Sequence, residues 1–183
     1  MANERLDSLP EIEAAVWREL ADAAHHLSHP WRTAVLATTD GEVADARTVV
    51  LRDTDNVAQR LTFFSDARAP KVAQLSVNPH GTLVMWSPAL NWQLRLRVQL
   101  QAVTDGLAVS SRWARLKLSP AAHDYLSAKA PGSVLDNALG ARGSRAHFAL
   151  ILADIQAIDW VELHPQGQRR ARFGGGEAIW LQA

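Results

Sequence analysis

The chain has 183 residues, of which 48% are hydrophobic and 21% are charged, which is the composition of an ordinary globular domain with a buried core. Its 19 basic residues balance its 19 acidic residues, so no overall field draws it to nucleic acid or to an anionic membrane, and any bound anion must be held by a local cluster of cations. Cysteine is absent, which excludes disulfides and thiol nucleophiles. The sequence has no signal-peptide pattern and no apolar run of ~18 residues. We therefore expect a single cytoplasmic domain.

The first predicted element is an amphipathic helix. Apolar residues recur at helical spacing after Ser8, which forms the pattern of a capping box with Glu11, so we predict a helix over residues 10–28. His25 and His29, near its end, are four residues apart, a spacing found in helical metal sites. No third ligand has a matching spacing, and cations are favoured at a helix C-terminus in any case, so no metal site is predicted.

Strand patterns follow this helix. Asp40-Gly41 is a strong hairpin signal between the first two strands, and polar and apolar residues alternate strictly in the fifth, so one of its faces must be buried. Only one helix interrupts the series, with Ser65 or Asp66 as its expected N-cap. Because parallel strands need a crossover helix between each pair, the short connections favour an antiparallel barrel. The predicted strands cover residues 34–38, 47–52, 61–64, 81–86 and 93–102, and the helix covers residues 69–75.

The C-terminal half adds helical and strand segments. The apolar period becomes helical over residues 106–130, whereas residues 137–144 hold glycine and serine breakers and are expected to be mobile or ordered by a ligand. Two late strands, residues 148–152 and 155–163, precede a final hairpin over residues 168–181. We therefore predict a mainly β protein with flanking helices, organised as a single domain (residues 1–183) with an N-terminal helix (10–28), a barrel core (about 33–103 and 148–183) and a helical insertion (about 106–130).

The stretch of most chemical interest is Arg-Thr-Val-Val-Leu-Arg at residues 47–52. As a strand it places an apolar pair beside a cation on each face. It is followed by Phe-Phe-Ser-Asp at residues 63–66 and then by Lys71. A helix that opens beside Ser65 offers unpaired backbone donors to an anion, with Arg68 and Lys71 close by. Such an arrangement could hold a flat apolar group that ends in an anion. The alternative is an ordinary barrel strand with solvated ends.

Common catalytic and nucleotide-binding motifs are missing from the sequence. It contains no G-x-G-x-x-G that opens a helix, no P-loop and no H-E-x-x-H, and no G-x-S-x-G. Dispersed cations on barrel strands therefore point to a cofactor that supplies the chemistry, in preference to a side-chain nucleophile.

Four motifs together resemble the pyridoxamine 5′-phosphate oxidase superfamily of flavin mononucleotide (FMN) split-barrel proteins. They match in order and spacing over roughly residues 30–103, and a weaker match covers the C-terminus. The motifs are the 47–52 strand, Phe-Phe-Ser-Asp-Ala-Arg-Ala-Pro-Lys at residues 63–71, Asn-Pro at residues 78–79 and Leu-Asn-Trp-Gln-Leu-Arg at residues 90–95.

The resemblance implies a Greek-key split barrel and a homodimer with two FMN molecules at the subunit interface. Lys71, with Arg68 and Arg47, would neutralise the FMN phosphate, while Gln93 would reach the isoalloxazine edge. Residue Ser133 lies in a segment that would contact the phosphate from the second subunit. The residues that the resemblance assigns to FMN are Arg47, Thr48, Val49, Val50, Leu51, Arg52, Phe64, Ser65, Arg68, Lys71, Gln93, Ser133 and Arg172.

The substrate residues of the oxidases are not retained. Their Arg-Leu-His-Asp-Arg-Phe motif, in which the first Arg and the His hold the vitamin, reads Gln-Arg-Arg-Ala-Arg-Phe at residues 168–173 here. Arg52 replaces a lysine, and guanidinium and ammonium groups are not equivalent. A Tyr, Arg and Ser set that holds the substrate phosphate has no counterpart around Trp113, Lys117 and Ser119. We therefore expect that FMN is kept and that pyridoxamine phosphate is not the substrate.

Three functions remain open from the sequence. The first is an FMN-dependent oxidoreductase that acts on an unidentified small molecule, in which the flavin carries the chemistry and no side chain is assigned as a catalytic acid or base. The second is a non-catalytic FMN carrier or redox sensor, because the substrate positions are changed. The third is a split barrel that binds another planar cofactor, such as haem or a deazaflavin.

Overall fold

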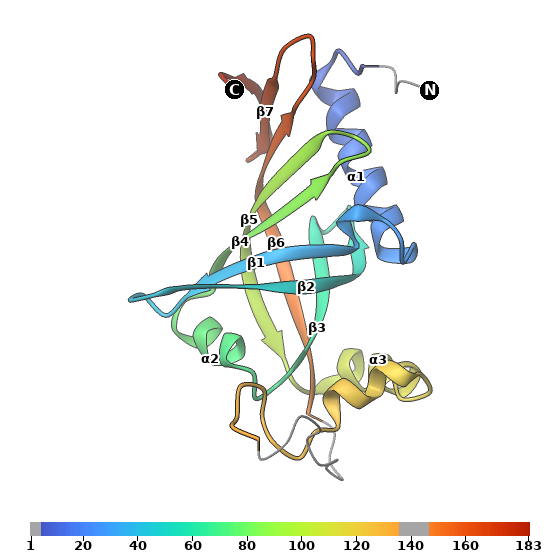
Figure 1. Ribbon diagram of the computed structural model, residues 1–183, viewed down its shortest axis with the longest axis vertical. Coiled ribbons are helices and arrows are strands. Elements are labelled where there is room, and N and C mark those ends of the chain that lie inside the picture. Colours follow the sequence, from blue (N-terminus) through green and yellow to red (C-terminus); the bar gives the residue numbers. More distant parts are fainter. Residues whose placement is uncertain (1–4, 136–146) are drawn as a thin grey trace.

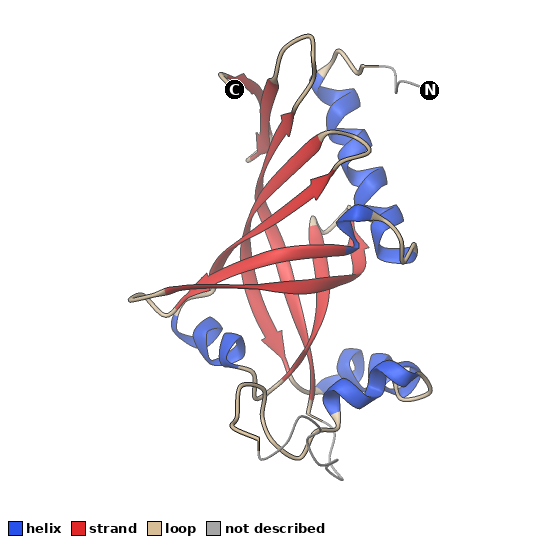
Figure 2. Ribbon diagram, viewed as in Figure 1, coloured by secondary structure: helices blue, strands red, loops and turns tan. Residues whose placement is uncertain are grey.

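Six strands of an antiparallel sheet curl until the two outer strands pair with each other (Figures 1 and 2). The computed structural model describes residues 5–135 and 147–183, so the predicted 137–144 segment lies outside the described residues. The elements in chain order are α1 (Leu9–His25), the 3-10 turn η1 (Pro30–Arg32), β1 (Thr33–Thr39), β2 (Ala44–Asp55), β3 (Arg60–Asp66), α2 (Pro70–Val77), β4 (His80–Ser87), β5 (Trp92–Val103), α3 (Gly106–Leu116), the 3-10 turn η2 (Pro120–Tyr125), β6 (Phe148–Glu162), β7 (Arg169–Gly174) and β8 (Glu177–Leu181).

The strand order is β3-β2-β1-β4-β5-β6, and pairing of β3 with β6 closes the barrel. The connection from β3 to β4 passes through α2, which gives the Greek-key order. This confirms the predicted antiparallel barrel with flanking helices. Strands β7 and β8 continue the sheet beyond β6, and their two-residue turn uses Gly175 and Gly176 at positive φ angles of 64° and 80°, as a type I′ turn requires.

Strand β6 belongs to the barrel and to the outer extension at once. Its first half pairs with β3 and β5, and its second half pairs with β5 and β7. The two late strands predicted from the sequence are therefore one strand. Asp154, which lies between the two predicted strands, forms an ion pair with Arg60 across the closing pair of strands (2.5 Å), and a β-bulge at Gln156 bends the strand.

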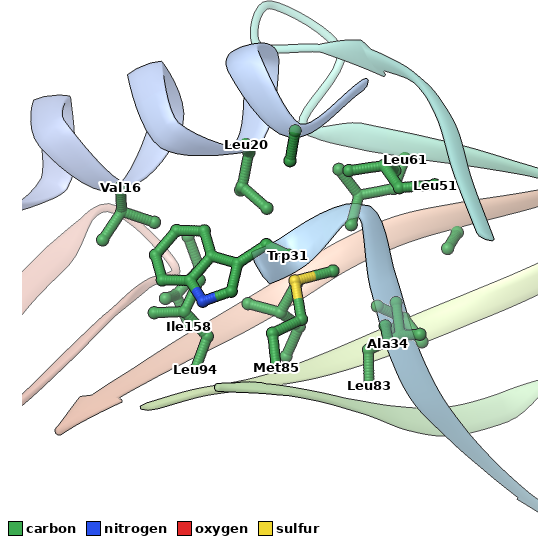
Figure 3. Close-up of a cluster of buried hydrophobic side chains, with 14 of the residues drawn as sticks. Val16, Leu20, Trp31, Ala34, Leu51, Leu61, Leu83, Met85, Leu94 and Ile158 are labelled. Carbon is green, nitrogen blue, oxygen red and sulfur yellow. The ribbon is translucent and has the colours of Figure 1, made fainter. Parts of the chain in front are cut away.

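Helix α1 covers one end of the barrel and completes its core (Figure 3). Its inner residues Val16 and Leu20 are fully buried, as is Trp31 of η1. The capping box of Ser8 and Glu11 is present as predicted. The helix ends at His25, three residues earlier than predicted, and the Arg32 guanidinium donates to the carbonyl oxygens of Ala23 and Ala24 in its last turn.

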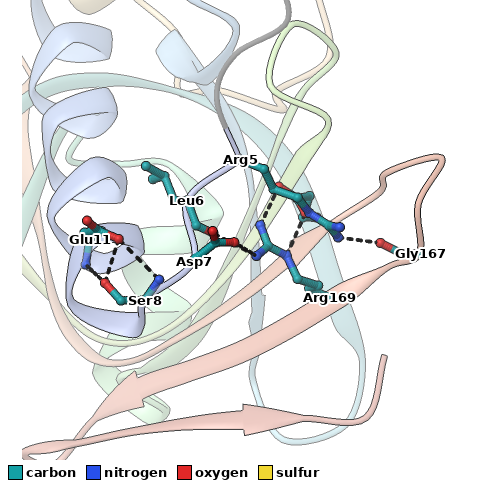
Figure 4. A network of polar contacts seen from close by, with 8 residues as sticks. Arg5, Leu6, Asp7, Ser8, Glu11, Gly167 and Arg169 are labelled. Atoms are coloured by element: carbon teal, nitrogen blue, oxygen red, sulfur yellow. Dashed lines mark hydrogen bonds and ion pairs between the residues drawn. The ribbon is translucent and has the colours of Figure 1, made fainter.

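The segment before α1 is tied to the far end of the sheet (Figure 4). The buried Glu162 carboxylate accepts from the Nε atoms of Arg5 and Arg169, each at 2.8 Å. Arg5 also donates to the Gly167 carbonyl at 2.7 Å, and Arg169 to the Leu6 carbonyl at 2.7 Å. Burial alone would raise the pKa of Glu162, but the hydrogen bonds from the two arginines hold it below its ordinary value.

The helical insertion lies with α2 at the end of the barrel opposite the two chain termini (Figure 1). The helical period predicted over residues 106–130 forms an α-helix only as far as Leu116, and the rest of the range contains the 3-10 turn η2. Proline starts that turn, and no capping side chain satisfies its first donors. In the described part of the chain, no helix has both the length and the apolar character needed to cross a bilayer.

We expect Leu20→Ala to lower the free energy of unfolding by about 2–5 kcal/mol, because it leaves a cavity between α1 and the barrel. Leu27→Ala is the matched control, since Leu27 is 83% exposed and should cost no more than ~0.5 kcal/mol. Urea unfolding at one fixed protein concentration measures both. Similar losses for the two variants would contradict the packing described for α1.

Candidate functional site

Strand β2 carries cations on both of its faces. Val49 and Leu51 are buried against the core together with the partly buried Arg47, whereas Thr48 and Val50 face away from it. The two apolar pairs and the two arginines are thus divided between the faces as the alternation predicted. Arg47 and Arg52, at opposite ends of this stretch, are separated by roughly 16 Å of strand.

Arg47 contacts α2 through the side chain of Gln74. Its Nη1 donates to Thr38 Oγ1 at 2.5 Å and to the Leu36 carbonyl at 3.3 Å, and its Nη2 donates to Gln74 Oε1 at 3.2 Å. Asp45 forms an ion pair with the same guanidinium. Most of its donors are therefore in use within the chain, and the arginine is fixed in position beside the start of α2.

Lys71 is the cation at this end whose ammonium is still available. Within the described residues its side chain has no hydrogen bond or ion pair. Burial lowers the pKa of Lys71, and the nearby charge of Arg47 lowers it further, although Asp66 and Asp45 oppose the shift. Lys71 belongs to the first turn of α2, where no side chain caps the helix. Two adjacent cations and uncapped backbone donors form an anion-binding environment.

The predicted N-cap of α2 is wrong. Ala69 takes that position, and Asp66 is occupied because its carboxylate accepts from the Arg68 guanidinium at 2.7 and 3.0 Å and from the Arg68 backbone N–H at 2.8 Å. The hydroxyl of Ser65 is buried and donates to the Asp66 carbonyl at 3.1 Å. The strand end is thus held by local hydrogen bonds that do not reach the helix.

Arg68 links this strand end to the loop that contains Ser133. Its guanidinium donates to the carbonyl oxygens of residues 127, 128 and 129 at 3.0 to 3.3 Å. Burial would raise the pKa of Asp66, but the hydrogen bonds from Arg68 outweigh this effect and the pKa lies below its ordinary value. In this arrangement Arg68 holds the loop against the end of β3. Ser133 is exposed in the same loop.

A cavity of about 570 Å³, here called the α3 pocket, lies at the other end of the β2 stretch. It is formed by α3, the last turn of α1 and the outward side chains of β2 and β3. Phe64 and Leu116 supply apolar wall, and most of the remaining lining is cationic or hydroxylic. The lining residues are His25, Arg52, Asp53, Phe64, Ser111, Arg112, Arg115, Leu116 and Ser119.

The positive charge of the α3 pocket is only partly compensated. Arg112 pairs with Asp53 at 2.6 Å, but Arg115 has no polar partner among the described residues. The Arg52 guanidinium lies 5.3 Å from the Phe64 ring centroid, and its Nε is buried without a hydrogen bond. Burial and the charge of Arg52 lower the pKa of Arg32. A buried donor without a partner and repelling guanidiniums both favour an anionic ligand.

Sequence reasoning missed Ser111 and Arg115 because it looked for the anion-holding set around Trp113 and Lys117. In the structure, Ser111, Arg115 and Ser119 line one side of the pocket that Arg52 reaches from the other. The four-residue spacing of Ser111 and Arg115 was the available signal, since it places both side chains on one side of α3. A cationic and hydroxylic set is therefore present where none was predicted.

Gln93 and Arg172 lie far from this region along the sheet. Register pairs connect Thr48 through β1, β4, β5 and β6 to Arg172, and all residues of this row point to the outer face. Five strand spacings correspond to ~24 Å along the sheet. Gln93 lies on the same face, one pleat from Arg95, beside a cavity of about 250 Å³ that Arg97 and Arg172 line. Gln93 and Arg172 thus form a second group, separated along the sheet from the predicted site residues around β2.

Comparisons with known proteins relate the chain to one family. Residues 14–104 match the family model described as "Pyridoxamine 5′-phosphate oxidase, FMN-binding domain". A pyridoxine/pyridoxamine 5′-phosphate oxidase of Nostoc sp. (strain PCC 7120) is 32% identical over 100 residues, which are 55% of this chain and 45% of that protein. The match thus covers less than half the length of this curated relative.

Solved structures show the same fold over nearly the whole chain. A pyridoxamine 5′-phosphate oxidase-related, FMN-binding protein from Nostoc punctiforme superposes with a TM-score of 0.76 at 19% identity, covering 97% of this chain and all of that one. PhzG from Burkholderia lata, in complex with tetrahydrophenazine-1-carboxylic acid, gives a TM-score of 0.75 at 15% identity, with full coverage of both chains. At these identities the likeness shows the split-barrel fold.

We expect Asp66→Asn to destabilise the protein at neutral pH and to cost progressively less in acid. Because the pKa of folded Asp66 lies below its unfolded value of about 3.9, the carboxylate stabilises the fold above that pH, and its contribution disappears as the pH falls through the folded pKa. Urea unfolding at about pH 7 and at several values below about pH 4 measures the difference.

The control for this pH dependence is Glu177→Gln, which alters an exposed carboxylate on β8. It should leave the pH dependence of stability as in the wild type. If Asp66→Asn lowers the free energy of unfolding by the same amount at neutral and acid pH, the ion pair between Asp66 and Arg68 is not the source of the destabilisation.

Proposed function

This chain belongs, through residues 14–104, to the pyridoxamine 5′-phosphate oxidase FMN-binding family, and from this premise we propose that it is an FMN-dependent oxidoreductase acting on a small anionic molecule. The observation that carries the proposal is the pair of cation clusters at the two ends of the 47–52 stretch. The cluster around Lys71 would bind the phosphate of the flavin. The cluster around Arg52 would bind a charged group of a second molecule, which lies beside the flavin.

Lys71 is the main phosphate ligand in this proposal. Its ammonium has no polar partner among the described residues, it belongs to the uncapped first turn of α2, and Arg47 is held beside it by Thr38 and Gln74. A doubly charged phosphate would relieve the repulsion that lowers the pKa of Lys71. Arg68 contributes indirectly, through the loop that it holds, and Ser65 contributes through its backbone.

The outer face of β2 receives the flavin ring in this proposal. Thr48 and Val50 leave an open, partly apolar surface there, and the backbone of residues 47–52 provides polar groups along its edge. Phe64 continues this surface toward the α3 pocket. When bound, FMN supplies hydride and electron transfer, and the protein residues bind and orient the two reactants.

A homodimer would bring the second group of residues to the flavin. Arg172 and Gln93 are ~24 Å along the sheet from Thr48 in one protomer, so we assign them to the FMN held by the partner. The surface between the two groups includes Val35 and Trp86, which are 44% and 41% exposed. Exposed apolar residues on such a surface are expected at a subunit contact.

The α3 pocket would hold an anionic head group of the substrate. Arg52 and Arg115 are its cations without an acidic partner, and Phe64 with Leu116 offers contact to an apolar body. PhzG, which has the same fold, was solved with an organic acid. A carboxylate or a phosphate on a planar organic molecule is the substrate class that these residues favour.

A non-catalytic FMN carrier or redox sensor is the second candidate. It is favoured by Arg170, which stands where the oxidases resembled here have a substrate-binding histidine. Both Nε and Nη2 of Arg170 donate to the Asp159 carboxylate, at 3.1 and 2.7 Å. That side chain is therefore occupied within the chain and offers little to a substrate.

The function is tested with the purified chain. We expect a yellow protein, or one that takes up FMN, and mass spectrometry of the extracted cofactor separates FMN from haem or a deazaflavin. Anaerobic photoreduction, followed by oxygen and by a panel of organic acids and phosphate esters as electron donors, separates the two candidates. Turnover with any donor supports the oxidoreductase, whereas reoxidation without turnover supports the carrier. A colourless protein that takes up no FMN would refute both.

We expect Lys71→Ala to weaken FMN binding by about 1.5–3 kcal/mol, the usual contribution of a hydrogen bond to a charged group. The stability of the FMN-free chain should hardly change, because burial and Arg47 already disfavour the charged lysine. Fluorescence titration with FMN measures the affinity. The control is Lys117→Ala, which removes an exposed lysine at the end of α3 and should bind FMN normally. Unaltered affinity in Lys71→Ala would remove Lys71 from the site.

A further inference from the structure

The cavity of about 250 Å³ on strands β4 to β7, here called the arginine pocket, is lined mainly by arginines. Strand β5 supplies Arg95 and Arg97, and β7 supplies Arg170 and Arg172, so each strand places two guanidiniums on the same face. Strand β6 runs between them and supplies a single carboxylate, that of Asp159. The lining residues are Thr82, Arg95, Arg97, Ala157, Asp159, Arg170, Arg172 and Leu181.

The single carboxylate of the arginine pocket is already in use. Asp159 Oδ2 accepts from Arg95 Nη2 at 2.6 Å, and Arg170 donates to both carboxylate oxygens, at 3.1 and 2.7 Å. Burial alone would raise the pKa of Asp159, but the hydrogen bonds from the two arginines hold it below its ordinary value. Four guanidiniums against this one carboxylate leave the lining with a net positive charge.

Two arginines of the pocket, Arg97 and Arg172, have no hydrogen bond or ion pair within the described residues. Arg172 is already assigned to the flavin held by the partner, which leaves Arg97 without a role in the fold or in the proposed FMN site. The neighbours of Arg97 across the sheet are Thr82 on β4 and Ala157 on β6, and both are small, so open space remains beside its side chain. The β-bulge at Gln156 adjoins this position, and bulges commonly re-aim side chains next to binding sites.

We propose that the arginine pocket binds a phosphate group and that Arg97 is its principal ligand. A guanidinium recognises phosphate through two parallel hydrogen bonds, and no described residue engages the donors of Arg97. Arg95 uses only Nη2 in its contact with Asp159, so it adds a second cation from the same strand. The volume of about 250 Å³ lies just below the usual range of small-molecule sites, ~300–1,000 Å³, so the pocket takes a compact anionic group and not a whole cofactor.

The location of the pocket suggests what the bound group does, and this step rests on the proposed function. Arg172, which lines the pocket, and Gln93, which lies beside it, are the residues assigned to the partner's flavin. A phosphate held by Arg97 would therefore lie next to that flavin, in a place separate from the α3 pocket. The arginine pocket would anchor a phosphorylated small molecule beside the flavin.

The test isolates the arginine pocket from the other two cation clusters. The full chain that carries Lys71→Ala and Arg115→Gln, which weaken the clusters at both ends of the 47–52 stretch, is titrated with methyl phosphate and with inorganic phosphate. Calorimetry at constant ionic strength measures both affinities. The titration needs no FMN, so a failure of the proposed cofactor and a failure of this inference are distinguishable. Methyl phosphate that binds at least as well as inorganic phosphate supports an esterified ligand, whereas much weaker binding of the ester overturns the role as an anchor.

We expect Arg97→Gln, added to this background, to weaken the binding of both phosphates about tenfold or more, the effect of losing one hydrogen bond between charged groups. Arg97→Lys keeps the charge but loses the paired donors, so its affinity should fall between the two. The matched control is Arg18→Gln, which removes one positive charge from an exposed position on α1. It should bind both phosphates as the background chain does.

Urea unfolding of the same variants separates a change in binding from a change in stability. Arg97→Gln should not lower the free energy of unfolding, because no described residue loses a hydrogen bond or ion pair. No detectable phosphate binding in the background chain, or equal affinities for Arg97→Gln and Arg18→Gln, would each overturn the inference.

Discussion

The pairing of β3 with β6 is the constraint on which the rest of the structure depends. Seven register pairs, from Arg60 with Asp154 to Asp66 with Phe148, close the barrel and remove the sheet edge that β3 would otherwise expose. Closure sets the position of β2, which lies next to β3, and brings the starts of α2 and α3 to the same end of the molecule (Figure 1). Cations from separate parts of the chain thereby gather around a single strand.

The site that results has more positive charge than the fold requires. Lys71 beside Arg47, and Arg52 near Arg32, are like charges whose proximity lowers pKa values and opposes folding. Several other arginines of the described residues form ion pairs with carboxylates, as Arg60 does with Asp154. Like charges at two places along one strand support the anionic ligands proposed above, because perturbed ionisable groups are often found at functional sites.

Much of this could be predicted from the sequence, because period-two alternation and capping chemistry are local. The faces of β2, the buried face of β5 and the Ser8 capping box followed directly from these rules. The start of α2 did not, because Arg68 competes for the Asp66 carboxylate. Nor did the α3 pocket, because Arg115 looks like any solvated residue of a surface helix until the packing of α3 turns it toward Arg52. Whether the thirteen residues assigned to FMN bind it remains a prediction.

The buried carboxylate of Glu162 has a consequence for how the molecule opens. The two arginines that bind it come from opposite ends of the chain (Figure 4). Releasing either arginine would leave the buried carboxylate with only one positively charged hydrogen-bond partner. The segment before α1 and the β6–β7 hairpin therefore cannot fray independently. They form one cooperative unit, so amide hydrogen exchange at the two places follows a common opening event although more than 150 positions separate them in the sequence.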